Sequence, residues 1–101
     1  MNAALQLART YGVEVHLADL GDWGTSELRS EYDPDGPVIR INLRVAETMQ
    51  RESLAEFVTL CVGHELYHHR ECIGEVGRLE DRIARESAAD AFARALAESR
   101  A

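Results

Sequence analysis

The stretch HELYHH at residues 64–69 contains three of the four histidines of this chain and places a glutamate directly after the first of them. On a helix, His64 and His68 project from the same face one turn apart, so their ring nitrogens can converge on one ion. Glu65 lies about 100° further round the helix and can reach a water on that ion without binding it. The H-E-x-x-H motif works in this way: two neutral imidazoles bind zinc, and the carboxylate is the general base.

A catalytic zinc needs three protein ligands and one open position, so this motif requires a third side chain from elsewhere. Glu86 follows His68 by 18 residues, within the segment ESAAD at 86–90. A short, glycine-containing connection would fold its helix back beside the first as an αα-hairpin and bring Glu86 opposite the histidines. Asp90, one turn further along, is placed to accept a hydrogen bond from a ligand imidazole and so fix its tautomer.

Two other interpretations of the histidine segment stay open. An ordinary polar helix face would show the same letters by accident at about the per cent level. The spacing of Glu65 and His68 is also the E-x-x-H signature of carboxylate-bridged di-iron proteins, which need two such motifs and two further glutamates. This chain has one E-x-x-H, so a di-iron site would require a dimer.

The hydrophobic pattern around the motif predicts a single α+β domain over residues 1–101. Alternating apolar and polar residues predict strands, and helical periodicity predicts helices. The predicted strands are VEVHLADL at 13–20, TSELRSEY at 25–32 and VIRINL at 38–43. The predicted helices are residues 2–11, about Ser53 to Gly74, and about 78–99. We expect an N-terminal helix and a small antiparallel three-stranded sheet packed on the active-site helix and the third-ligand helix.

Composition limits the partners of the protein. The net charge is −7, and the basic residues are scattered among acids, which argues against nucleic acid or a membrane as partner. No apolar run approaches the roughly 18 residues that cross a bilayer, and the N-terminus lacks the pattern of a signal peptide. A cytoplasmic location is therefore the expectation, in which Cys61 and Cys72 would stay reduced.

The combination of HELYH with ESAADAFA resembles the gluzincin metallopeptidases, whose pattern is H-E-x-x-H with a downstream E-x-x-A-D or E-x-x-A-N. The motifs resemble both the HtpX-like membrane proteases and the ImmA/IrrE-like family, and the strand IRIN at 39–42 also suits the ImmA/IrrE-like family. Since the sequence shows no membrane segment, the ImmA/IrrE-like proteins and the minigluzincins are the better comparison. The resemblance covers about residues 38–96. It implies a zincin-like fold with Zn²⁺ as cofactor, in which His64, His68 and Glu86 are the metal ligands, Glu65 is the base and Asp90 is a supporting residue.

The same resemblance implies hydrolysis of a peptide or protein substrate. Bound zinc lowers the pKa of its water towards about 7, and Glu65 would accept the proton and later pass it to the leaving amine. Gluzincin-like enzymes hold the substrate extended along an edge strand, and residues 23–32 are the candidate for that rim.

The chain departs from larger gluzincins, in which a subdomain after the third ligand completes the cleft and supplies a group that stabilises the oxyanion. Only 15 residues follow Glu86 in this sequence. The oxyanion donor is therefore expected to be absent, to come from a protein partner that completes the cleft, or to be drawn from a few candidates. These are Tyr11, Tyr32, Tyr67 and His69. A zinc-binding interaction or regulatory module with little or no turnover is accordingly the alternative function.

Overall fold

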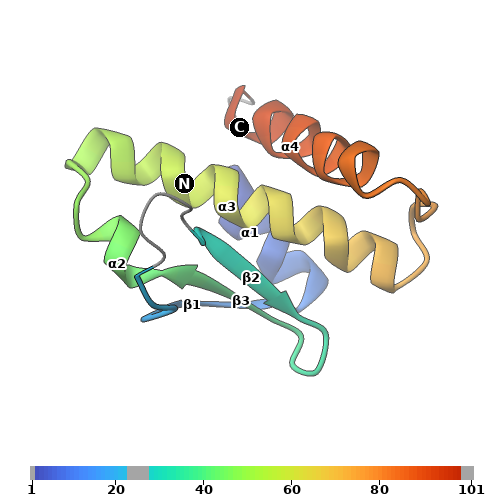
Figure 1. The fold of residues 1–101 in the computed structure, drawn as a ribbon, viewed down its shortest axis with the longest axis horizontal. Coiled ribbons are helices and arrows are strands. Elements are labelled where there is room, and N and C mark those ends of the chain that lie inside the picture. Colours follow the sequence, from blue (N-terminus) through green and yellow to red (C-terminus); the bar gives the residue numbers. More distant parts are fainter. Residues whose placement is uncertain (1, 23–27, 99–101) are drawn as a thin grey trace.

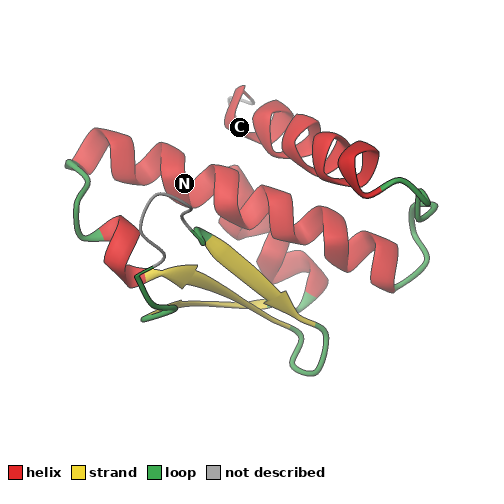
Figure 2. Cartoon of the chain, viewed as in Figure 1, coloured by secondary structure: helices red, strands yellow, loops and turns green. Residues whose placement is uncertain are grey.

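The structure, a computed structural model, describes residues 2–22 and 28–98. This part of the chain forms a small sheet with helices packed against it. The elements are α1 (Ala3–Tyr11), β1 (Glu14–Ala18), β2 (Ser30–Asp33), β3 (Val38–Asn42), α2 (Leu43–Ala46), α3 (Arg51–Cys72) and α4 (Arg82–Glu98). Figure 1 shows the long helix α3 lying across the sheet, with α4 beside it on the side away from the strands. In Figure 2 the strands lie together below α3 and α4, and the short helix α2 continues from the end of β3. Helices with one small sheet confirm the α+β class. None of the helices in this described part is long and apolar enough to cross a membrane.

The sheet is mixed, so the prediction of an antiparallel sheet is wrong for one of its two strand pairs. The strand order is β1-β3-β2, in which β2 is antiparallel to β3 but β1 is parallel to it. Alternation along the sequence identifies each strand without saying which strand pairs with which. Four of the five residues of the central strand β3 are buried, whereas none of the residues of the edge strands β1 and β2 is buried.

The register of β2 on β3 determines which of its side chains reach α3. Ser30 is paired with Ile41, and Tyr32 with Ile39. Residues directly opposite each other on neighbouring strands project from the same face of the sheet. Ile39 and Ile41 are in the core with α3, so Ser30 and Tyr32 also project towards that helix.

The buried side chain of Asn42 holds three segments together where β3 ends. Its Oδ1 accepts hydrogen bonds from the backbone nitrogens of Leu20 and Arg44, and its Nδ2 donates to the carbonyls of Gly21 and Leu28. Asn42 is only 1% exposed, and these four hydrogen bonds satisfy both polar atoms of its amide within the protein. The bond to Arg44 also caps α2, a short helix that the sequence did not predict.

The predicted αα-hairpin is present. Helix α3 ends at Cys72, and Gly74 then adopts a φ of 77°, a left-handed conformation that glycine accepts without steric cost. Helix α4 begins at Arg82, later than predicted, because the Asp81 carboxylate accepts hydrogen bonds from the first free backbone nitrogens of the helix, those of Ile83 and Ala84.

Small residues let α3 and α4 approach closely. A Cβ atom built on Gly63 would lie only 2.7 Å from Cα of Ala93 and 2.9 Å from its Cβ, so no larger residue fits there without moving a helix. Ala89 and Ala93 are the buried residues of α4. This close packing brings the carboxylates of α4 within reach of the residue that follows Gly63, which is His64.

Candidate metal centre

Four polar residues of α3 face two different neighbours. His64 and His68 are four residues apart and face α4, where they meet Glu86 and Asp90. Glu65 and His69 are also four residues apart, but their face of the helix is turned towards β2. One helix therefore presents a histidine pair to one side and a glutamate–histidine pair to the other.

Both ring nitrogens of His64 have a carboxylate from α4. Nδ1 lies 2.7 Å from Oδ1 of Asp90, and Nε2 lies 3.2 Å from Oε1 of Glu86. Glu86 and Asp90 are themselves one helical turn apart, so a single stripe of α4 provides both contacts. The structure thus places Asp90 against the outer nitrogen of the ring, as the sequence predicts.

His68 is held in the same manner by a residue that the sequence interpretation missed. Its Nδ1 lies 2.8 Å from Oε1 of Glu71, and its Nε2 lies 3.0 Å from Oε2 of Glu86. Arg85 donates two hydrogen bonds to Glu71, at 2.9 and 3.2 Å, and the Glu71 side chain is only 3% exposed. Arg85 is the main cause that lowers the pKa of Glu71, to about 2, so this carboxylate is ionised at any ordinary pH.

These contacts determine the tautomers of the two histidines. An ionised carboxylate only accepts hydrogen bonds, so the Nδ1 atoms facing Asp90 and Glu71 must carry the hydrogens. In neutral rings, the Nε2 atoms then present lone pairs. Those lone pairs point at each other across 3.3 Å and at the two oxygens of Glu86. Acceptors alone converge at this point, and a cation is the species that would satisfy all of them.

The spacing of the converging atoms fits a metal ion. Four ligands placed tetrahedrally at about 2.0–2.1 Å from zinc lie roughly 3.3 Å from one another. The two Nε2 atoms are 3.3 Å apart, and the distances from them to the Glu86 oxygens are 3.0 and 3.2 Å. The donor set of two imidazoles and a carboxylate is one that zinc, iron and other transition metals accept.

Glu65 is the fourth member of this group. Ligand atoms of His64, Glu65 and His68 lie within 4.8 Å of one another and could hold a metal ion. Glu86 is the closer carboxylate to the imidazoles, and Glu65 is instead held by a bond from the Ser30 hydroxyl to its Oε2, at 2.7 Å. Glu65 is buried, and this burial raises its pKa, while the Ser30 bond acts in the opposite direction. A carboxylate that has a raised pKa and lies beside the candidate metal site is suited to accept a proton.

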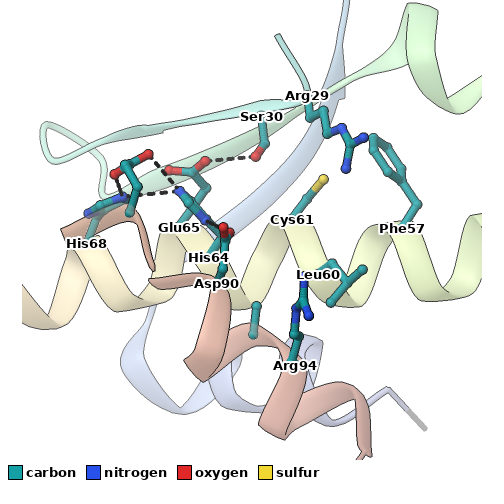
Figure 3. Close-up of a pocket in the computed structure, with 12 residues that line it drawn as sticks. Arg29, Ser30, Phe57, Leu60, Cys61, His64, Glu65, His68, Asp90 and Arg94 are labelled. Carbon is teal, nitrogen blue, oxygen red and sulfur yellow. Dashed lines mark hydrogen bonds and ion pairs between the residues drawn. The ribbon is translucent and has the colours of Figure 1, made fainter. Parts of the chain in front are cut away.

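An open cleft lies in front of these residues. It has a volume of about 480 Å³, and Figure 3 shows His64, Glu65, His68 and Asp90 lining one part of it. Glu86, which contacts both histidines, also lines the cleft. Of the predicted rim at 23–32, residues 23–27 lie outside the described residues. Arg29 and Ser30 do line the cleft. The side chain of Glu86 is 48% exposed, so solvent and small solutes can reach the centre from the α4 side.

The side chains proposed as oxyanion donors are mostly engaged elsewhere. Tyr11 donates a hydrogen bond to Glu75, and Tyr67 packs against the ring of Phe92. His69 is buried, which lowers its pKa, and its Nδ1 lies 2.7 Å from the hydroxyl of Tyr32.

Tyr32 is the one of these four that lines a surface hollow next to the candidate ligands, together with Glu65, His68 and Glu86. Burial raises the pKa of Tyr32 to about 12, so its hydroxyl keeps its proton and remains a donor. That donor is directed at His69 in this structure.

Three contributors to the centre were not predicted: Ser30, Glu71 and Arg85. Glu71 could have been found, because it follows His68 by three residues and shares its side of the helix. Ser30 and Arg85 carry no local signal, since each acts through a contact with a distant part of the chain.

Comparisons of the chain with family models, with curated proteins and with solved structures gave no match.

Proposed function

We propose that the protein is a zinc-dependent metallopeptidase with a zincin-like fold. The observation that carries this proposal is the convergence of both Nε2 atoms and the Glu86 carboxylate at tetrahedral spacing, with every outer contact holding the rings in the metal-binding tautomer. The resemblance of HELYH and ESAADAFA to gluzincin motifs supports the same assignment, because it names the same residues independently of their positions in space.

Zinc bound by His64, His68 and Glu86 would polarise a peptide carbonyl and activate a water. Glu65 then acts as the proton acceptor. Its Oε2 is occupied by Ser30, while Oε1 makes no hydrogen bond with any residue in the described ranges, so the proton would be taken at Oε1. The raised pKa of Glu65 makes this carboxylate a better base than an exposed glutamate, and it can return the proton to the leaving amine.

The residues around the ligands keep this arrangement in place. Asp90 and Glu71 hold the outer nitrogens of the two histidines, and Arg85 holds Glu71. Outer contacts of this kind typically change metal affinity or activity by about 10- to 100-fold when removed. These contacts therefore fix the orientation of each ligand ring.

Metal content is the first test. Purified protein loaded with zinc and desalted is expected to retain one zinc per chain, and Glu86→Gln is expected to retain much less. Glu56→Gln, an exposed glutamate on the same helix as the histidines, is the matched control and is expected to retain zinc like the wild type. Iron at two per site would instead support the di-iron interpretation.

Turnover is the second test. Zinc-loaded wild type and Glu65→Gln are incubated with a diverse peptide pool, and the products are identified by mass spectrometry. Cleavage by the wild type and by Glu56→Gln, but not by Glu65→Gln, is the expected result. Cleavage that persists in Glu65→Gln at the wild-type rate would contradict the proposed role of this residue.

A zinc-binding module with little or no turnover is the second candidate function. It is favoured by the engagement of the oxyanion candidates, because the hydroxyls of Tyr11 and Tyr32 are directed at Glu75 and His69 rather than at the candidate ligands. If the protein retains zinc but neither the wild type nor any variant cleaves a peptide, this function would be supported over the peptidase.

A further inference from the structure

The cleft extends from the candidate metal centre along the groove between α3 and α4. Apolar residues line its far end, where Figure 3 shows Phe57 and Leu60. Two arginines complete this end: Arg94 on α4, and Arg29 just before β2 on the opposite wall. Figure 3 shows both side chains on the side of the cleft away from His68.

The charges that line the cleft are separated by sign. Its carboxylates, those of Glu65, Glu86 and Asp90, are all at the metal end, where they contact the histidines or Ser30. The far end has guanidinium groups and no carboxylate among its described lining residues. An anionic group is therefore favoured at the far end and disfavoured near the ligands, except where the metal itself binds it.

Arg94 is available to such a group. It is exposed, and it makes no hydrogen bond or ion pair within residues 2–22 and 28–98. Asp90 lies four residues earlier and would be its ordinary helical partner. The Asp90 carboxylate is instead turned to His64, at 2.7 Å.

The position of Arg94 sets the distance at which it would act. Glu86, Asp90 and Arg94 form one stripe of α4, and eight residues of helix span about 12 Å. An extended peptide advances about 3.3 Å per residue. Arg94 therefore addresses a group three or four residues from a peptide bond held at the metal.

We propose that Arg94, at this positively charged end of the cleft, binds a carboxylate of the substrate, so that the site selects peptides with a carboxylate at the matching position. This inference rests on the proposed peptidase function. The carboxylate belongs to an aspartate or glutamate side chain or to the C-terminus of the peptide. Arginine suits either source, because its planar guanidinium binds a carboxylate through two parallel hydrogen bonds.

The test uses the zinc-loaded full chain and matched synthetic peptides. The peptides differ at one position, which is Glu, Gln or Arg, and each is made with a free or an amidated C-terminus. The variant is Arg94→Gln. The control is Arg51→Gln, an exposed arginine at the start of α3 that does not line the cleft. Circular dichroism and thermal melting establish that both variants fold.

The wild type and Arg51→Gln are expected to cleave a carboxylate-bearing peptide with a kcat/KM about fivefold above that of its neutral counterpart, and Arg94→Gln is expected to abolish the difference. A difference that follows Glu against Gln assigns the carboxylate to a side chain, and one that follows acid against amide assigns it to the C-terminus. A wild type without charge preference, or a preference that survives in Arg94→Gln, would overturn the inference.

Binding separates this inference from the peptidase function. Fluorescence anisotropy of the same peptides, labelled, on zinc-loaded Glu65→Gln measures recognition without turnover. Acidic peptides that bind more tightly than neutral ones, and lose this advantage in Glu65→Gln combined with Arg94→Gln, would support the inference even if no peptide is cleaved. Equal binding of acidic and neutral peptides, or no binding of either, would overturn it.

Discussion

The Ser30 hydroxyl lies 2.7 Å from Oε2 of Glu65 and so links the edge strand β2 to the proposed base on α3. This contact has two consequences for the carboxylate. It fixes the side chain with Oε1 left for a proton, and it opposes the rise in pKa that burial causes. Through Ser30, β2 thereby influences both the orientation and the pKa of the Glu65 carboxylate on α3.

Ser30→Ala is expected to raise the pKa of Glu65 further, because the bond that lowers it is lost while the burial remains. The acid limb of the pH profile of kcat/KM should move to higher pH, and kcat should fall about 3- to 10-fold as the carboxylate loses its orientation. Zinc content should not change, since Ser30 does not contact His64, His68 or Glu86. Ser53→Ala, on the exposed side of α3, is the control, and an acid limb identical to the wild type would contradict the role assigned to Ser30.

Glu71→Gln is expected to destabilise the metal-free protein at neutral pH by about 1–2 kcal/mol, because Arg85 loses a charged partner. The pKa of Glu71 is lowered from 4.5 to about 2 in the folded protein. Its ionised form therefore contributes stability that is fully present above the unfolded value and is lost as pH falls through the folded one. Urea unfolding between pH 7 and pH 2 should show the two proteins converging across this window.

Glu56→Gln, which removes an exposed charge from the same helix, is expected to show no such convergence. If the difference in free energy of unfolding between the wild type and Glu71→Gln stays constant down to pH 2, the stabilising charge does not belong to Glu71.

Gly63→Ala is expected to separate α3 from α4, because the added methyl group would lie 2.7 Å from the backbone of Ala93. Overpacking of this kind costs about 1–3 kcal/mol. Since α4 carries Glu86, zinc affinity should fall together with stability, as measured by unfolding and by competition with a chelator. Gly77→Ala is the control, since a Cβ there meets nothing within 4 Å. Unchanged zinc affinity in Gly63→Ala would show that the spacing of the two helices does not matter to the site.

The candidate ligands could be predicted because their relationships are local. His64 with His68, and Glu86 with Asp90, each share a helix face by spacing alone, and a short hairpin was enough to bring the two pairs together. Ser30 could not be predicted, because its contact with Glu65 depends on the register of β2 on β3 and on how the sheet meets α3.

The prediction of an antiparallel sheet was wrong for a similar reason. Alternation records which side chains of a strand are buried, but the parallel pairing of β1 with β3 depends on contacts between segments more than twenty residues apart. The close approach of α3 and α4 at Gly63 could not be predicted from the sequence either, because the residue that leaves no room for a side chain there is Ala93, on another helix.

The buried amide of Asn42 also depends on contacts with distant segments, those of Gly21 and Leu28. Asn42→Asp preserves shape but replaces the Nδ2 donor with an acceptor, so the carbonyls of Gly21 and Leu28 would face a buried negative charge. A loss of about 2–4 kcal/mol is expected at neutral pH. The loss should shrink in acid, because the protonated acid regains one donor, and urea unfolding at several pH values measures this.

The matched control for Asn42→Asp is Asn2→Asp. At that position the side-chain oxygen already caps α1 by accepting from the backbone nitrogens of Ala4 and Leu5. Aspartate keeps this cap and is favoured by the helix dipole, but it loses the hydrogen bond that Nδ2 of Asn2 donates to the Thr59 hydroxyl, so a loss of no more than about 1 kcal/mol is expected. Equal and small effects at both positions would mean that the amide of Asn42 does not hold the strand ends together, and that the path from β3 into α2 is maintained by the apolar core alone.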